Sequence, residues 1–363
     1  MDYKNDSRIV MTLDAGGTNF EFSAIQRGIE IIKPVRMLSC TTDKMECLSQ
    51  IVRGFKMVSS MIMQQPVAIS FAFPGPADYQ KGIIGDLPNF PCFTGGFALG
   101  PALNKIFNLP VFINNDGNLF AYGEAMSGTL PYINKRLEEK KSEKRFHNLI
   151  GITLGTGFGC GVVINNRLVI GDNATGGDIW CFRNKRHSHL IVEESVSIRA
   201  VKRVYQELSG TKEDLTPKDI FDIAEQKRAG DIQAARRSFE ELGEMAGDAL
   251  ASAVTIVDGM IIIGGGLAGA SKYIIPSIVK ELNHHLKLTD GTEVPRIQMR
   301  AYNLDEETEW KGFIAGEERI IPIPQSNETM KYDPLKRIGV MTTRQSTSQS
   351  IAMGAYLYAL SHL

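Results

Sequence analysis

The pattern of apolar and polar positions near the N-terminus predicts a hairpin and then a helix. Residues 8–13 and 20–25 are apolar runs of strand length, and Gly16 and Gly17 lie between them. Two such runs separated by a glycine turn are typical of a β-hairpin. Residues 43–63 carry apolar residues at helical spacing instead. We therefore expect a helix there, with its methionines filling the core.

Two later apolar runs end in turn or polar residues. Residues 67–73 end at a Pro-Gly-Pro turn, and residues 111–113 continue into Asn114, Asn115 and Asp116. Both runs predict buried strands that deliver such residues at their ends. The other segments of this half are expected to be a loop at 87–96, helices at 97–107 and 119–126, and a solvated charge run at 135–144.

The strand and glycine-turn pattern recurs in the middle of the chain. An apolar run at 149–154 is followed by a turn containing Gly155, Thr156 and Gly157, and then by a strand at 160–164. Self-similarity at a separation of about half the chain predicts two related lobes, each offering one glycine hairpin to a shared ligand.

The remaining pattern completes a two-domain organisation. Further elements are expected at 192–208, 217–228 and 231–257 as helices, at 260–263 as a strand entering Gly264, Gly265 and Gly266, and at 350–360 as a closing helix. The segment 288–345 is rich in charged residues and proline, and we assign no function to it. A small lobe is predicted at 1–118, with residues 349–363 packing back on it, and a large lobe at 119–348.

Length and charge fit a globular protein with two domains. The 363 residues exceed one ordinary core, and a cleft between two domains is the usual place for small-molecule chemistry. The formal net charge is −1, with lysines and arginines spread along the chain. Because phosphate-backbone binding needs a basic patch, nucleic acid is not expected as a partner.

Cysteines and apolar runs indicate the compartment. Five cysteines form no CxxC pair, which fits a reducing compartment, and we expect them to be buried small side chains. The N-terminus is polar, and no run of about 18 apolar residues occurs, so neither a signal peptide nor a membrane span is predicted. The expected location is the cytoplasm.

The glycine turns have the composition of phosphate cradles. Glycines let backbone N–H groups approach an anion closely, and threonine adds a hydroxyl donor. Asp14 beside the first turn can hold a hydrated Mg²⁺. Neither a P-loop nor a dinucleotide GxGxxG fingerprint occurs, so the nucleotide site is of another type. The candidate nucleotide-binding residues are Asp14, Gly16, Gly17, Thr18, Asn19, Gly155, Thr156, Gly157, Gly265 and Gly266.

Asp116 is the candidate general base. Phosphoryl transfer to an alcohol needs a proton acceptor beside the attacking oxygen, and a carboxylate just beyond a buried strand can project into a cleft. The alternative is that Asp116 only caps the helix that begins near Gly117.

In combination these motifs resemble the ROK family of sugar kinases and repressors. The matching segments, in order along the chain, are DAGGT at 14–18, PGP at 74–76, PN at 88–89, INNDGNLFAYGE at 113–124, TLGTGFGCGVVI at 153–164 and IIIGGG at 261–266. The resemblance implies a two-lobed α/β fold of the actin and hexokinase type, related to ribonuclease H, with ATP, Mg²⁺ and a sugar in the interlobe cleft. It also implies a homodimer.

The resemblance assigns roles to single residues. It makes Asp116 the catalytic base and places sugar contacts at Gly75, Asn89, Asn115, Asp116, Asp178 and Glu193. It implies phosphate contacts at both glycine turns, Mg²⁺ on Asp14 through water, and adenosine beside Gly265 and Gly266.

The sequence departs from the family pattern after residue 176. Asp178 stands where the family has glutamate, a histidine is absent, and no cysteine cluster follows. His187 and His189 lack cysteine neighbours, so we expect solvated loop histidines and no structural zinc. Trp180 could stack on a sugar face, and the alternative is a tryptophan in a core wall.

The predicted function is transfer of the ATP γ-phosphate to a hexose, with glucose at the 6-OH as the main hypothesis. The alternatives are an N-acetylhexosamine (N-acetylmannosamine or N-acetylglucosamine) or fructose as substrate. An alternative of another class is a sugar-binding regulator without kinase activity, because the family includes repressors.

Overall fold

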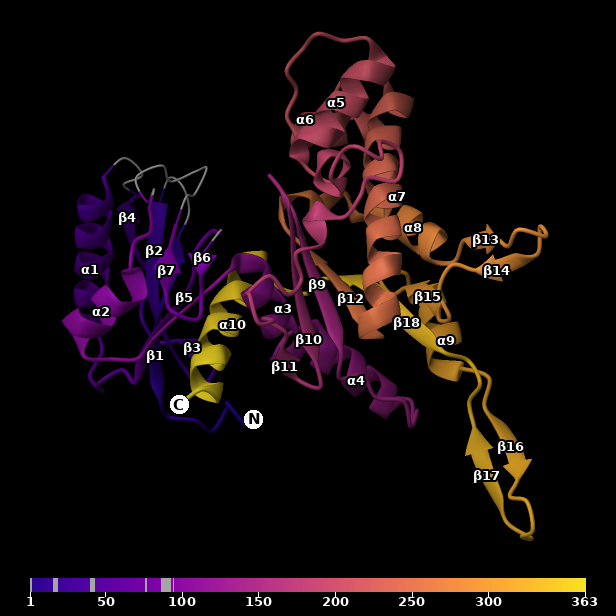
Figure 1. Cartoon of the computed structure of the whole chain (residues 1–363), viewed down its shortest axis with the longest axis horizontal. Coiled ribbons are helices and arrows are strands. Elements are labelled where there is room, and N and C mark those ends of the chain that lie inside the picture. The colour runs from indigo at the N-terminus through magenta and orange to yellow at the C-terminus, as the bar shows by residue number, and fades with distance from the viewer. Residues whose placement is uncertain (1, 16–18, 40–42, 76, 86–92, 94) are drawn as a thin grey trace. The chain divides into compact units, whose positions relative to one another are not determined.

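The computed structural model describes residues 2–15, 19–39, 43–75, 77–85, 93 and 95–363 (Figure 1). Contacts divide the chain into two compact units. The first unit comprises Met1–Gly128, Gly161–Gly177 and Gln345–Leu363, and the second comprises Thr129–Cys160 and Asp178–Arg344. The sequence-based boundary lay at 118/119; here residues 119–128 join the first unit, because the helix that contains most of them packs on the C-terminal helix.

The first unit is built on a mixed sheet with antiparallel and parallel pairings. Its strand order is β3-β2-β1-β5-β8, and β4 also pairs with β2. The strands are β1 (Ile9–Ala15), β2 (Asn19–Gln26), β3 (Ile29–Glu30), β4 (Val35–Leu38), β5 (Ala68–Ala72) and β8 (Val111–Asn114). β1 and β2 form the expected antiparallel hairpin, and β1, β5 and β8 run parallel.

Helices pack on both faces of this sheet. On one face, Met11 and Leu13 of β1 share a core with Phe55 of α1. On the other face, α10 packs on β1 and β5 and also contacts α3 along its length. The remaining elements of this unit complete the set: α1 (Lys44–Met61), β6 (Ala77–Asp78), β7 (Ile83–Ile84), α2 (Leu99–Phe107), α3 (Asp116–Met126), β11 (Arg167–Leu168) and α10 (Thr347–Ser361).

The second unit repeats this arrangement. Its sheet has the order β10-β9-β12-β18-β15, and β9, β12, β18 and β15 are joined by parallel pairings. The strands are β9 (Leu149–Leu154), β10 (Phe158–Ile164), which ends in the first unit, β12 (Met260–Gly264), β15 (Arg300–Asn303) and β18 (Arg337–Thr342). Each sheet thus has a pair of neighbouring strands, β1–β2 or β9–β10, at the positions predicted around the glycine motifs, and the first motif itself lies outside the described residues.

Helices and short hairpins complete the second unit. The helices are α4 (Thr129–Glu139), η2 (Ile179–Cys181), η3 (Val192–Ser195), α5 (Ile198–Ser209), α6 (Pro217–Ala224), α7 (Ile232–Val257), η4 (Gly266–Ala270), α8 (Ser271–Leu282) and α9 (Glu307–Ala315). The segment without a predicted function contains two-stranded sheets, β13 (His285–Lys287) with β14 (Glu293–Pro295) and β16 (Arg319–Pro322) with β17 (Thr329–Tyr332). Both project as narrow ribbons in Figure 1.

Three side-chain predictions were wrong. The methionines of the first helix do not fill the core: Met45, Met57 and Met61 are exposed, because the core-facing stripe of α1 consists of other residues such as Ile51 and Phe55. Cys181 is exposed rather than buried. Trp180 is 40% exposed and therefore does not lie in a core wall.

Within the described ranges, every helix is too short or too polar to cross a bilayer.

Candidate active site

Neighbouring parallel strands bring the candidate acidic residues of the first unit to one edge of its sheet. Asp14 of β1 pairs with Ala72 of β5, and Ala72 pairs with Asn114 of β8, so the three residues form one row. The carboxyl ends of parallel strands in an α/β sheet are the usual location of ligand sites. Asn115 and Asp116 follow directly from the end of β8.

Asn115, not Asp116, caps the helix α3. The Asn115 side-chain oxygen accepts the backbone N–H of Asn118 at 2.6 Å. The Asn118 amide in turn donates to Asn114 Oδ1 at 3.0 Å. The alternative in which Asp116 serves as the cap is therefore wrong. Asp116 is the first residue of the helix, and its side chain is not needed for the cap.

The Asp116 carboxylate is accessible and has a perturbed pKa. Its Oδ1 accepts the Gly117 N–H at 2.8 Å, and among the described residues no cation forms an ion pair with it. Asp116 is solvent-exposed, although many protein atoms surround its carboxylate. This desolvation raises the pKa of Asp116 above its ordinary value, and the charge of Asp14 raises it further, against backbone N–H groups that lower it.

Asp14 also has a raised pKa. Desolvation is the main cause and the negative charge of Glu21 adds to it, whereas the hydrogen bond with the Ser348 side chain lowers the pKa. The strand register, with Asp14 and Asn114 in one row and Asp116 two residues beyond Asn114, brings these two predicted site residues to the same sheet edge. Perturbed carboxylates at one sheet edge are typical of functional sites.

The other predicted residues of the first unit are only partly described. Gly75 lies in an exposed bend after β5, and Asn19 is an exposed residue at the start of β2. Gly16, Gly17, Thr18 and Asn89 lie outside the described residues.

The second glycine turn joins β9 to β10. Gly155 N–H donates to the carbonyl of Gly157 at 3.1 Å, and the carbonyl of Gly155 accepts the N–H of Ile198 at the start of α5. A Cβ at Gly155 would meet nothing within 4 Å, and Thr156 is exposed. The tip of the turn is therefore open to a ligand, as a phosphate cradle requires.

A carboxylate and a guanidinium hold this turn from the η3–α5 segment. Glu193 Oε2 accepts the N–H of Phe158 at 3.0 Å. Arg199 donates to Glu193 Oε1 at 3.0 Å, to Glu194 Oε1 at 2.7 Å and to the carbonyl of Thr156 at 3.2 Å. Glu193, a predicted sugar contact, is thus already bonded to the predicted phosphate turn.

Arg199 was missed from the sequence. The sequence contains Glu193 and Glu194 just before Arg199, which lies in the first turn of α5. The pattern reads locally as an ordinary surface charge pair. Only the fold shows that the same guanidinium reaches back over more than 40 residues to the glycine turn.

Asp178 and Trp180 occupy the region in which the sequence departs from the family. Asp178 is half-buried, and desolvation raises its pKa while a hydrogen bond from the Trp180 side chain lowers it. His187 and His189 are exposed, as expected for loop histidines. In the described part of the chain, no group of three histidine, cysteine, aspartate or glutamate residues could hold a metal ion.

The third glycine motif begins η4. Gly265 has a φ of +90°, and a Cβ there would lie 2.3 Å from the carbonyl oxygen of Leu154, so both conformation and space require glycine. A Cβ at Gly266 would meet nothing within 4 Å. Gly265 is therefore a packing residue against β9, and Gly266 presents an open surface.

Comparisons with known proteins agree with this arrangement. The model of the ROK family matches residues 10–308. A crystal structure of a glucokinase from Parabacteroides distasonis is 60% identical, with complete coverage of both chains and a TM-score of 0.91. The glucokinase of Thermotoga maritima is 26% identical over 74% of this chain and 88% of its own. An N-acetyl-D-glucosamine kinase of Haemophilus influenzae is 23% identical over 79% and 92%. These comparisons confirm the resemblance and the two-lobed α/β fold.

Proposed function

The chain belongs to the ROK family, and we propose that it is an ATP-dependent kinase that phosphorylates glucose on the 6-hydroxyl. The observation that carries the proposal is the environment of Asp116. Its carboxylate is accessible at the start of α3 and forms no ion pair with any described residue. It does not cap the helix, because Asn115 does so. The 60% identity to a glucokinase over the whole chain supports glucose as the substrate.

Asp116 acts as the general base of the proposed reaction. As the sugar oxygen attacks the γ-phosphorus, the hydroxyl proton moves to the Asp116 carboxylate. A bond forms between the sugar oxygen and phosphorus, the bond from phosphorus to the β–γ bridging oxygen breaks, and ADP leaves. The raised pKa of Asp116 makes it a stronger base than an ordinary aspartate.

The glycine turns bind and orient ATP. The open tip offers the Thr156 hydroxyl and the backbone N–H groups of Thr156 and Gly157 to phosphate oxygens, while the Gly155 N–H holds the turn together. Arg199 and Glu193 keep this tip in place from the neighbouring segment. Gly266 provides the open surface for adenosine, and Gly265 lets the chain pack closely against β9 beside it.

Asp14 is the residue that would hold Mg²⁺ through water. Mg²⁺ is usually held by one or two carboxylates together with substrate phosphates, and Asp14 provides one such carboxylate. When bound, the ion supplies neutralisation of the phosphate charge. Ser348 orients the Asp14 carboxylate by a hydrogen bond.

The sugar contacts are proposed at Gly75, Asn89, Asn115, Asp178 and Glu193. Asn115 uses its oxygen in the cap, and its amide N–H₂ has no hydrogen-bond partner in the described part of the chain. Asp178 is one methylene shorter than glutamate, so its contact to a sugar hydroxyl is expected to run through water.

An N-acetylhexosamine is the second candidate substrate. The H. influenzae relative bears the name of an N-acetyl-D-glucosamine kinase. The region of Asp178 and Trp180, where this chain departs from the family pattern, is the wall expected to distinguish the two sugars.

The deciding experiment measures ADP release with ATP and Mg²⁺ against glucose, fructose, mannose, N-acetylglucosamine and N-acetylmannosamine. We expect strong stimulation by glucose and little by the others. Stimulation by an N-acetylated sugar alone would replace glucose by the second candidate. ATP binding without stimulation by any sugar would contradict the kinase assignment and favour a sugar-binding regulator.

A further inference from the structure

The hairpin of β16 and β17, called here the β16–β17 ribbon, has unpaired edges. It projects from the second unit as a narrow two-stranded sheet (Figure 1), and neither strand pairs with a further strand of the described chain. A two-stranded ribbon by itself is at best marginally stable in water, and further strands or a packing partner stabilise it. The ribbon also lies beyond residues 10–308, the part of the chain that the ROK model matches.

The internal pairing of the ribbon determines which backbone groups point outward. The Ile323 N–H donates to the Glu328 carbonyl across the hairpin at 3.0 Å. Hydrogen-bonded and non-hydrogen-bonded pairs alternate along an antiparallel ladder. The pairs that Thr329 and Lys331 form with β16 are therefore non-hydrogen-bonded. The N–H and C=O groups of these two residues point away from β16, toward the free edge of β17.

The two edges of the ribbon differ in what they offer to another strand. On the β16 edge, Pro322 has no N–H to donate, which disfavours pairing there. On the β17 edge, Thr329 and Lys331 are both exposed. An edge lysine discourages pairing through its charge, but Lys331 Nζ lies 3.2 Å from Glu318 and 3.6 Å from Glu143. The β17 edge is therefore open, and its cation is already paired.

Exposed apolar side chains lie beside this open edge. Met330 is 53% exposed and Tyr332 is 49% exposed. They are two residues apart on β17 and so lie on one face, where Ile321 of β16 is opposite Met330. A strand added to the β17 edge would cover part of this apolar surface.

The β17 edge is complementary to a second copy of itself. An antiparallel copy can hydrogen-bond only through Thr329 and Lys331, the residues with outward backbone groups. Placing Thr329 opposite Thr329 would put Glu328 opposite Met330, and placing Lys331 opposite Lys331 would oppose like charges. Placing Thr329 opposite Lys331 puts Met330 opposite Met330 and Glu328 opposite Tyr332. This last register pairs apolar with apolar and opposes no like charges.

The β13–β14 hairpin lacks this complementarity. The Leu288 N–H donates to the Thr292 carbonyl at 2.9 Å, so the same alternation makes His285 and Lys287 the outward residues of β13. Every pairing of β13 with its own copy through these residues opposes two basic side chains. On β14, Pro295 removes an outward N–H.

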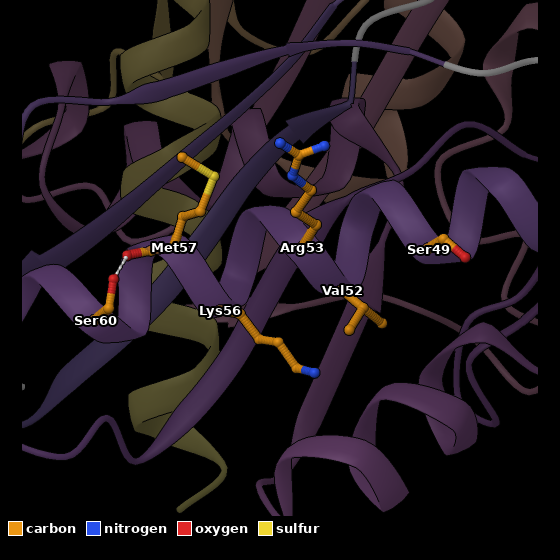
Figure 2. Close-up of a pocket in the computed structure, with 6 residues that line it drawn as sticks. All are labelled: Ser49, Val52, Arg53, Lys56, Met57 and Ser60. Atoms are coloured by element: carbon orange, nitrogen blue, oxygen red, sulfur yellow. Dashed lines mark hydrogen bonds between the residues drawn. The ribbon is translucent and has the colours of Figure 1, made fainter.

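The hollow over α1 in Figure 2 offers no such edge either. It is lined by six residues of that helix, and Arg53 and Lys56 point to opposite sides of it. Diverging surface cations do not converge on one ligand.

We propose that β17 pairs antiparallel with β17 of a second copy of this chain, so that two ribbons form one sheet in the order β16-β17-β17-β16. Thr329 of each copy exchanges hydrogen bonds with Lys331 of the other, and the two Met330 side chains are in contact. The proposal assigns a surface and a register to association between copies. It does not depend on the proposed kinase function, because it concerns the ribbon alone.

The first test is disulfide cross-linking of the full chain. In the proposed register the two Met330 residues form a non-hydrogen-bonded pair with Cα atoms about 4.5 Å apart, a separation that a disulfide can span. We expect Met330→Cys, made together with Cys181→Ser to remove an exposed thiol, to give a covalent dimer on mild oxidation. The Cys181→Ser chain oxidised in parallel gives the background.

Leu286→Cys in the same background is the matched control. Leu286 lies on the β13–β14 hairpin and is 47% exposed, close to the 53% of Met330. It should cross-link much less. Equal cross-linking of the two variants, or no cross-linking of Met330→Cys above the background, would overturn the proposal.

A mixture of two variants tests the register. Glu328 of one copy is opposite Tyr332 of the other, so Glu328→Cys mixed with Tyr332→Cys should give dimers that contain one chain of each. A size tag on one variant distinguishes these dimers. Each variant oxidised alone should give little dimer, and dimers as abundant as in the mixture would contradict the register.

Proline substitutions test the edge by analytical ultracentrifugation. Lys331→Pro removes an outward N–H that the ribbon itself does not use, and it should raise the dissociation constant at least about tenfold. Ile320→Pro is the matched control, because Ile320 is opposite Lys331 and its N–H points to the β16 edge. Lys331→Ala keeps the N–H and should still associate. Equal effects of the two prolines, or an unsubstituted chain that stays monomeric, would overturn the proposal.

Discussion

Asn115 and Asp116 are neighbours in the sequence, but they have different partners in the structure. The side-chain oxygen of Asn115 is occupied by the Asn118 N–H. Asp116 accepts only backbone hydrogen bonds and stays accessible. A carboxylate that is desolvated but not neutralised favours the protonated state more than a free aspartate does. This residue-scale difference is what makes Asp116 suitable as a base.

The first prediction concerns Asp116→Asn. We expect kcat to fall about 10²- to 10⁴-fold, because the amide cannot accept a proton. The sugar affinity should stay within about tenfold, because the amide still forms hydrogen bonds. Steady-state kinetics with glucose and ATP provide the measurement. Turnover like that of the unchanged enzyme would remove Asp116 from its assigned role.

The second prediction concerns pH. The folded-state pKa of Asp116 is raised from 3.8, so kcat should decline with falling pH at a higher pH than for an ordinary aspartate. For stability, a raised folded pKa means that the ionised carboxylate opposes folding above that pKa, and that this penalty vanishes below the unfolded pKa. Asp116→Asn should therefore raise the melting temperature at neutral pH, and the gain should shrink as the pH falls through that window.

Asp290→Asn is the control for the pH prediction. The Thr292 N–H lowers the pKa of Asp290, so removing its charge should bring no stability gain at neutral pH. Equal gains for both variants would show that the effect is not specific to the desolvated carboxylate.

At the scale of elements, two contacts hold the candidate site residues in position. The η3–α5 segment supports the second glycine turn through Glu193 and Arg199. In the first unit, α3 and α10 approach each other closely at glycines. A Cβ at Gly354 would lie 1.9 Å from the carbonyl oxygen of Leu119, and one at Gly123 would lie 2.0 Å from that of Ser350.

The glycines between α3 and α10 give the third prediction. Gly354→Ala should destabilise the protein by about 1–3 kcal/mol, because the obstacle is backbone and the two helices must separate. Chemical denaturation is the measurement. Gly269→Ala, where a Cβ meets nothing within 4 Å, is the control and should leave stability unchanged or slightly raised. Equal effects of the two substitutions would contradict the close packing.

The fourth prediction concerns Arg199→Gln. Loss of the contacts to Thr156 and Glu193 should loosen the glycine turn and raise the KM for ATP about tenfold, the equivalent of about 1.4 kcal/mol, with a smaller change in kcat. Arg199→Lys should recover part of the loss. Arg186→Gln is the matched control, because Arg186 is similarly exposed and ion-paired but binds Glu241 and Glu244. A rise in KM for both variants would indicate a general charge effect.

At the scale of the whole molecule, the chain repeats one arrangement of strands in two units. In each sheet two neighbouring strands flank a glycine motif of the sequence, and the first of these strands pairs in parallel with a later strand. The net charge is −1 over 363 residues. Repetition of the glycine turn, rather than a concentrated basic surface, is the main global feature of the chain.

The charge distribution gives the fifth prediction. Although the family includes repressors, we expect no complex with genomic DNA fragments in a gel shift at about 0.15 M salt, because affinity for the phosphate backbone requires clustered cations. A complex that survives this salt concentration would revive the hypothesis of a DNA-binding regulator.

Features that depend on neighbours in the chain could be predicted from the sequence. Glycine turns between apolar runs were recognisable because a hairpin needs only local conformational freedom, and the predicted strands at both turns occur in the structure. Asp116 could be proposed as the base because it follows directly from a buried strand. The family motifs added the roles of distant residues by resemblance.

Only the tertiary structure decided features that depend on residues far apart. The choice of Asn115 as the cap, the exposure of the α1 methionines and the contact of Arg199 with Thr156 depend on which face or atom meets a distant partner. A hollow between β2 and α10 likewise joins Ser23 and Ala352, which are distant in the sequence. A periodic pattern indicates whether a segment is a helix or a strand. Its burial and side-chain contacts arise from packing against distant residues, and a short stretch of sequence carries no information about those.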